Sequence, residues 1–219
     1  MMKVYCIPGV GGGEKIFSRL RLKKAEVVPL KWLQPERGEN LPSYAKRLAA
    51  QIDTSRPFWL LGVSFGGMVA IELSRFLSPG RIVLVSSVRN RAELPWYGKL
   101  LGKMGVHHLA AMPLARSLVP LSSSILGVET EEDYQLLKEL VNTTDGPFLR
   151  WSIRQSWRWN PEYPPPANLV HIHGTADRIF PARFVNPDIW IEGGGHFMIV
   201  SRADEIGALL DRLVTMEDS

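Results

Sequence analysis

The sequence has little cysteine and lacks any long hydrophobic run. Cys6 is the single cysteine among 219 residues, so no disulfide can form within the chain. It lies in the apolar run of residues 3–7, where a small core residue is a more common role than a reactive thiol. No apolar segment is long enough to cross a bilayer, and no signal-peptide pattern opens the chain. We therefore expect a cytoplasmic protein with no membrane span.

The chain also lacks a strong excess of charge. Its 26 Lys and Arg residues nearly balance 22 Asp and Glu residues, which leaves a formal net charge of +4. The basic residues are scattered, whereas nucleic-acid-binding proteins gather them on one face or segment. We therefore predict no nucleic-acid partner. The length suits one domain with room for an inserted subdomain.

Six short apolar runs in the sequence are typical of buried β-strands. They are residues 3–7, 26–30, 58–61, 81–85, 168–173 and 188–191. Between them, apolar residues recur at helical spacing, most clearly at 41–52 and 206–213, and a short helix is expected at 14–20. This alternation predicts an α/β fold with a mostly parallel sheet of about six strands and helices on both faces.

The alternation stops after the fourth run. The next stretch has helical patterns at residues 97–104, 108–118, 130–140 and 147–159, and it ends in three prolines. Thr130 and Asp133 resemble the pair of residues that opens a helix. We therefore predict a core made of residues 1–89 and 167–219, and a helical cap insertion at 90–166 that crosses the sheet.

A G-x-S-x-G motif at residues 62–66 separates the third strand from a helix. This is the context that a nucleophile elbow requires. Gly62 and Gly66 remove the Cβ atoms that would clash in such a tight turn. Ser64 would then stand exposed above the sheet, at a helix start whose free N–H groups attract negative charge. Taken alone, the motif is also compatible with a simple glycine-rich turn.

A second glycine-rich segment, residues 9–13, follows the first strand. It is not a P-loop, because no Lys-Ser or Lys-Thr pair follows it. It is a poor dinucleotide-binding motif, because Glu14 occupies the place of the third glycine. A loop whose backbone N–H groups face an oxyanion fits better. We expect no cofactor.

Two further polar residues, Asp177 and His196, follow the last two strands. Because the carboxyl ends of parallel strands lie at one edge of a sheet, we expect these residues to meet Ser64 there. His196 would take the serine proton, and Asp177 would hold the imidazole in one tautomer. Backbone N–H groups of Val10 and Phe65 would receive the oxyanion.

His171 and His173 lie two residues apart on the fifth strand, so they share one face. Two imidazoles could begin a metal site, but the sequence offers no third ligand. We therefore predict no metal.

These motifs, in this order, resemble the α/β-hydrolase superfamily over nearly the whole chain. The resemblance rests on Pro8-Gly9, residues 62–67, residues 173–177 with Pro181, and residues 195–197. It implies an α/β-hydrolase fold in which residues 90–166 form the cap. It implies that Ser64 is the nucleophile, Asp177 the acid and His196 the base. It also implies that the backbone N–H groups of Val10 and Phe65 are the oxyanion donors.

The chain departs from the family pattern at two places. Pro8 stands where the family often has histidine, which leaves the backbone donor but changes the loop. The sequence also begins directly on that strand, without the leading antiparallel strands usual in the family. Ser64 separates the chain from the dehalogenase branch, which uses an aspartate at this position.

The insertion contains four of the seven tryptophans. Trp96, Trp151 and Trp157 are candidate pocket residues for an apolar or aromatic acyl group, although core packing is the commoner use of such residues. Leu149 and Ile153 repeat with Trp157 on one helical face, and a cap needs such an apolar underside.

The sequence therefore predicts a serine hydrolase that cleaves a small carboxylic ester or thioester through an acyl-enzyme on Ser64. Arg150, Arg154 and Arg158 form a basic stripe, most simply a solvated face, which could also meet an acidic acyl carrier. Two alternatives stay open on the same fold: a non-catalytic ligand-binding or receptor protein, and a lyase that uses the same residues without an acyl-enzyme.

Overall fold

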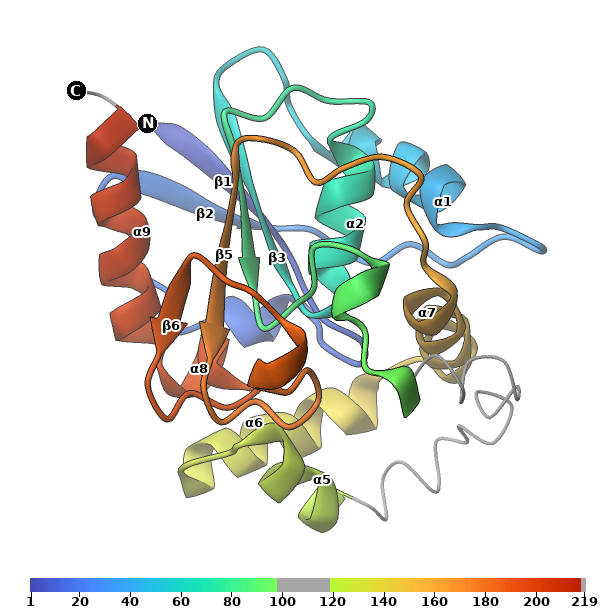
Figure 1. Cartoon of the computed structure of the whole chain (residues 1–219), viewed down its shortest axis with the longest axis vertical. Helices are drawn as coiled ribbons and strands as arrows, with labels where there is room; N and C mark the ends of the chain where they lie inside the picture. Colours follow the sequence, from blue (N-terminus) through green and yellow to red (C-terminus); the bar gives the residue numbers. More distant parts are fainter. Residues whose placement is uncertain (98–118, 218–219) are drawn as a thin grey trace.

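The computed structural model describes residues 1–97 and 119–217, and its centre is one parallel β-sheet (Figure 1). The six strands have the order β2-β1-β3-β4-β5-β6, and every neighbouring pair is parallel. Each strand lies on a run expected from the sequence: β1 Met2–Ile7, β2 Ala25–Pro29, β3 Phe58–Val63, β4 Arg81–Val85, β5 Leu169–Gly174 and β6 Ile189–Ile191. The predicted α/β sheet is confirmed.

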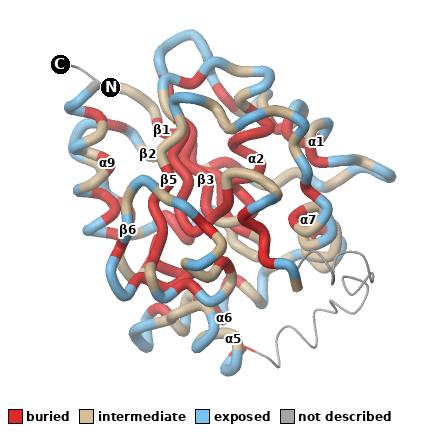
Figure 2. Tube along the Cα trace, viewed as in Figure 1, coloured by how far each residue is buried: buried red, intermediate tan, exposed pale blue. Residues whose placement is uncertain are grey.

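The sheet separates two hydrophobic cores, because successive side chains of a strand point to opposite faces. In β1, Val4 and Cys6 belong to one core, while Tyr5 and Ile7 belong to the other. Figure 2 shows how continuously the central strands are buried, and all six residues of β3 are buried. Burial raises the pKa of the Cys6 thiol, so this residue is inert core packing, as predicted.

Helices cover both faces of the sheet (Figure 1). α1 Leu41–Leu48 and α2 Phe65–Leu73 pack on one face, and α9 Ala203–Glu217 packs on the other, beside the short α8 Met198–Ser201. The helix expected at 14–20 is a 3-10 turn, η1 Glu14–Phe17. Its backbone bonds reach back three residues rather than four, which limits such helices to short pieces. Further 3-10 turns are η2 Ala49–Gln51, η3 Arg91–Glu93 and η5 Ala182–Phe184.

A helical insertion connects β4 to β5. Its described helices are α5 Val119–Leu126, α6 Glu131–Thr143 and α7 Gly146–Arg158. The helices expected at 130–140 and 147–159 are confirmed, and Thr130 caps α6 by accepting a bond of 3.2 Å from Asp133 N. Of the other two, the segment 108–118 and all but one residue of 97–104 lie outside the described residues.

The insertion is bonded to the core at several points. On α6, Asp133 is fully buried and forms an ion pair with Arg19 of the core. After α7, the indole N–H of Trp159 donates to the buried Glu72 of α2 at 2.8 Å. α5 and α6 lie across the carboxyl ends of the strands in Figure 1, where the insertion was expected to cross. None of the described helices combines the length and hydrophobicity needed to span a membrane.

Candidate active site

Ser64 occupies a strained turn between β3 and α2. Its φ and ψ are +54° and −119°, which a residue with a side chain rarely adopts and which costs roughly 1–3 kcal/mol. A Cβ on Gly62 would lie 2.3 Å from Gly66 O, and one on Gly66 would lie 2.2 Å from Ile7 O. Both motif glycines are therefore required by contact, as the sequence predicted.

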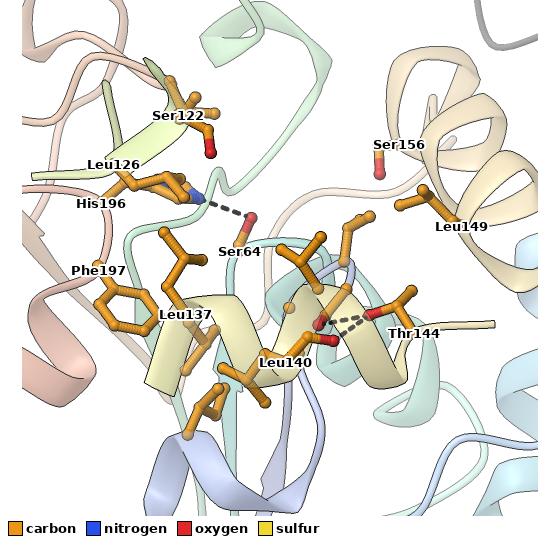
Figure 3. Close-up of a pocket in the computed structure, with 18 of the residues that line it drawn as sticks. Ser64, Ser122, Leu126, Leu137, Leu140, Thr144, Leu149, Ser156, His196 and Phe197 are labelled. Carbon is orange, nitrogen blue, oxygen red and sulfur yellow. Dashed lines mark hydrogen bonds between the residues drawn. The ribbon is translucent and has the colours of Figure 1, made fainter. Parts of the chain in front are cut away.

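The neighbouring strand holds this turn in place. Ser64 N donates to Val85 O at 3.0 Å, and the hydroxyl of Ser87 donates to Ser64 O at 2.6 Å. These bonds satisfy the backbone of Ser64 and leave its side chain free to face the cavity (Figure 3). Ser87 was not identified from the sequence, because a serine after a strand carries no distinctive pattern.

The three polar residues that follow β3, β5 and β6 form one hydrogen-bonded chain. His196 Nε2 lies 3.0 Å from Ser64 Oγ, although the two residues are 132 positions apart in sequence (Figure 3). His196 Nδ1 lies 2.8 Å from Asp177 Oδ2. The arrangement can accept a proton from the serine hydroxyl and stabilise the resulting imidazolium.

Asp177 is buried and has a partner for each carboxylate oxygen. Oδ1 accepts backbone N–H bonds from Ile179 at 2.8 Å and Phe180 at 2.9 Å, while Oδ2 faces His196. Burial alone would raise the pKa of this carboxyl, but the charge and hydrogen bond of His196 outweigh it and hold the pKa below its usual range. Asp177 is therefore ionised at neutral pH.

His171 and His173 lie behind Asp177, inside the protein. His171 Nε2 is 3.1 Å from His173 Nδ1, and His173 Nε2 donates to Phe180 O at 2.9 Å. Burial lowers the pKa of both imidazoles, that of His171 to about 3, so the pair is neutral. Across residues 1–97 and 119–217, no group of three His, Cys, Asp or Glu side chains is placed to hold a metal ion.

The glycine-rich loop after β1 forms a tight turn beside Ser64. Gly12 N donates to Gly9 O at 3.0 Å, and Gly11 has a φ of +69°, as the third residue of a type II turn requires. Because the peptide is trans, the N–H of Val10 points away from Gly9 O. Phe65 is the first residue of α2, so its N–H has no acceptor within the helix. Both backbone groups could receive a negative oxygen.

A cavity of about 460 Å³ opens beside Ser64 and His196. Its lining includes no Asp, Glu, Lys or Arg among the described residues, and its apolar walls come from the core and the insertion alike. α6 contributes Leu137 and Leu140, and α7 contributes Leu149, Ile153 and Trp157. Phe197 follows His196 directly and lies across the cavity from Leu149 in Figure 3. Such a cavity suits an apolar group better than a charged one.

The three candidate tryptophans lie in different places. Trp157 lines the cavity. Trp151 packs instead against Tyr44 of α1, with ring centroids 4.5 Å apart, and donates to Glu39 O at 3.0 Å. Trp96 is 66% exposed and outside the lining. The expectation fails for Trp151 because its face of α7 points away from the cavity. It fails for Trp96 because that side chain points to solvent.

Comparisons with known proteins agree with this architecture. The family model described as "Alpha/beta hydrolase family" matches residues 4–209. Comparison with curated protein sequences finds no match.

Solved structures share the fold at low sequence identity. A thermophilic esterase from Thermogutta terrifontis is 14% identical, over 99% of this chain and 90% of that chain, with a TM-score of 0.74. The hydrolase olei00960 from Oleispira antarctica is 13% identical, over 98% and 91%, with a TM-score of 0.74. The RedJ thioesterase of prodiginine biosynthesis in Streptomyces coelicolor is 20% identical, over 95% and 84%, with a TM-score of 0.61. Since the family model covers nearly the whole chain, this protein belongs to the alpha/beta hydrolase family.

Proposed function

We propose that the protein is a serine hydrolase that cleaves a carboxylic ester or thioester with an apolar acyl group. One observation carries this proposal: the hydrogen-bonded chain from Ser64 through His196 to Asp177 lies at the wall of an apolar cavity. Ser64 is the nucleophile, His196 the general base and Asp177 its orienting acid. The division into a core and a cap at 90–166 belongs to the same proposal, with the cap supplying part of the substrate pocket.

In the acylation half of the reaction, Ser64 Oγ attacks the substrate carbonyl carbon while its proton passes to His196 Nε2. The carbonyl oxygen becomes an oxyanion that the N–H groups of Val10 and Phe65 bind. Each such donor stabilises the transition state by about 3 kcal/mol. When the intermediate collapses, the bond to the alcohol or thiol breaks, and His196 returns the proton to that leaving group.

In the deacylation half, a water molecule attacks the acyl-enzyme and gives its proton to His196. The second intermediate then releases the carboxylic acid, and Ser64 Oγ regains its proton. Asp177 holds the imidazole with Nε2 toward the serine throughout both halves, because its Oδ2 lies on Nδ1.

The test is labelling by a fluorophosphonate, which reacts with an activated serine. We expect labelling and ester hydrolysis by the wild-type protein and neither by Ser64→Ala. The matched control is Ser74→Ala, because Ser74 lies at the other end of α2 and its hydroxyl donates to Ile71 O. Labelling that persists in Ser64→Ala would refute the assignment of the nucleophile.

The same preparation separates the alternatives. Mass spectrometry after brief mixing with an ester should show an acyl group on Ser64, which a lyase mechanism would not form. Repeated turnover would exclude a receptor that only binds its ligand. Alkyl esters and thioesters of graded chain length then compare the two substrate classes.

A further inference from the structure

The oxyanion loop, residues 9–13, is bonded to a side chain of the insertion. Thr144 follows α6 directly, and its Oγ1 lies 2.9 Å from Gly11 O and 2.7 Å from Leu140 O. Figure 3 draws both contacts beside the cavity. A hydroxyl has one proton to donate, so Thr144 shares it between the loop carbonyl and the end of its own helix. The threonine therefore joins the helix to the loop.

This loop needs an external support. It contains three consecutive glycines, Gly11 to Gly13, and glycine has the greatest backbone freedom of any residue. The turn bond from Gly12 N to Gly9 O constrains one end of the loop. Trp32 Nε1 donates to Gly12 O at 3.1 Å, so the core supplies a second constraint. Thr144 supplies a third constraint, on the adjacent carbonyl.

The carbonyl that Thr144 bonds is close to the proposed oxyanion donor. Gly11 O shares a peptide plane with Gly12 N, which donates to Gly9 O, and Gly9 O shares a peptide plane with the Val10 N–H. Rotation of the Gly11–Gly12 peptide therefore also changes the direction of the Val10 N–H. A Cβ placed on Gly9 would lie 3.3 Å from Ser64 Cβ, which shows how closely the loop passes the serine. A small shift of the loop therefore changes the distance from the N–H to the developing oxyanion, and about 1 Å of misplacement can cost about a hundredfold in rate.

α6 is a firm support for this contact. Its first turn is held by the ion pair of buried Asp133 with Arg19, a core residue that lies shortly after the oxyanion loop. Leu137 and Leu140 are buried beneath it. The helix is thus packed on the core, and Thr144 at its end has a defined position.

We propose that Thr144 is a positioning residue of the catalytic reaction, through which the insertion orients the oxyanion donor Val10. The proposal rests on the proposed hydrolase function. The threonine contacts the loop rather than the reacting atoms, and it lowers the transition-state energy by keeping the Val10 N–H in place. The Val10 N–H binds a negative oxygen only in the transition state, so loss of its orientation should reduce kcat more than it changes KM.

The test compares three variants with the wild-type protein on one alkyl ester. Thr144→Val keeps the shape and removes the hydroxyl, and we expect kcat to fall about tenfold while KM stays within about twofold. Thr144→Ser restores the hydroxyl and should recover most of kcat. The matched control is Thr143→Val, because Thr143 is an exposed neighbour whose hydroxyl donates only within α6, to Glu139 O and Leu140 O.

A second measurement reports on the oxyanion directly. A trifluoromethyl ketone forms a tetrahedral adduct with the serine, and its inhibition constant in Thr144→Val should rise by about the same factor as kcat falls. An unchanged kcat in Thr144→Val, or an equal fall in Thr143→Val, would overturn the role of Thr144 while leaving the hydrolase function intact. An equal fall in Thr144→Val and Thr144→Ser would overturn it as well. Absence of hydrolysis by the wild-type protein would overturn both proposals.

Discussion

The loops at the ends of β3, β5 and β6 and the insertion between β4 and β5 contribute differently to one site. The loops carry the two titratable groups that are hydrogen-bonded in a chain to the serine, Asp177 and His196. The described part of the insertion lines the cavity with apolar side chains and hydroxyls, and no titratable residue stands among them. In the proposed mechanism, the core therefore supplies reactivity, and the insertion supplies shape and support.

The difference follows from how each region is held. β3, β5 and β6 are parallel strands of one sheet, so their terminal loops lie at the same edge, and a short motif on each loop is enough to bring Ser64, Asp177 and His196 together. The insertion has no such frame and depends on individual contacts. One of them joins it to the histidine loop, where Phe197 N donates to Leu126 O at 2.8 Å. Variants of the two regions should consequently fail in different ways.

The largest effect is expected in the core. Asp177→Asn keeps the shape of the side chain but allows the wrong imidazole tautomer, so kcat should fall on the order of 10⁴-fold with little change in KM. Steady-state ester hydrolysis measures both constants. A fall of less than about tenfold would show that His196 does not depend on this carboxylate.

The buried histidine pair should make the core sensitive to acid. The pKa of His171 is about 3 in the folded protein, against an ordinary value near 6.5, so the unfolded chain binds an extra proton between these values. Stability should therefore be lost as the pH falls through this window, by about 2 kcal/mol between pH 6.5 and pH 4.5 from His171 alone. Because the pKa of Asp177 is held below its usual range, its own contribution to stability is lost mainly below pH 4.5.

Urea unfolding at the two pH values tests this expectation. His171→Gln keeps an amide donor near the position of Nε2 but does not titrate, so the loss of stability between the two pH values should shrink by about 2 kcal/mol. His173 is present in both the wild-type protein and the variant, so the difference in pH dependence between the two proteins reports on His171. An equal pH dependence in wild type and variant would contradict the neutral state of His171.

A smaller effect is expected where the insertion meets the histidine loop. A Cβ on Gly127 would lie 2.7 Å from Gly195 Cα, so Gly127→Ala should push the loop of His196 out of position and reduce kcat/KM about thirtyfold. Gly38→Ala is the matched control, because Gly38 also has a positive φ but has nothing within 4 Å of the added methyl. Both variants should lose stability from the positive φ, Gly127→Ala should lose more because of the added contact, and only Gly127→Ala should lose activity. Equal activity would show that this contact does not position His196.

The smallest effect is expected at the cavity wall. Trp157→Ala should raise KM about tenfold for a long acyl ester and much less for an acetyl ester, because the side chain contacts the apolar part of the substrate. Trp96→Ala should leave both values unchanged, since Trp96 is exposed and outside the lining. A KM change that does not depend on chain length would place the acyl group elsewhere in the cavity.

The accuracy of the sequence-based predictions also differs between the two regions. In the core, hydrophobic runs located all six strands within one or two residues, and the glycines around Ser64 indicated the elbow. In the insertion, the pattern located α6 and α7, and it placed Trp157 on the face that lines the cavity. It failed for Trp151, because amphipathicity shows that a face is buried but not what buries it. It also failed for Trp96, which is exposed and lies outside the cavity lining.

By itself, the sequence determined the parallel sheet, the order of its polar loops and the tight turn at Ser64. Each of these depends on local periodicity or on the absence of a side chain at a glycine, and both features can be recognised in the amino-acid sequence. Only the tertiary structure decided which side chains complete the site: Ser87 behind the serine, the neutral histidines behind Asp177, and Thr144 on the oxyanion loop. Ser87 and Thr144 reach the site through single hydrogen bonds across 23 and 133 positions of the chain, and a bond between distant residues leaves no periodic trace in sequence. The neutral state of the two histidines depends on their burial, which two neighbouring positions on a strand do not reveal.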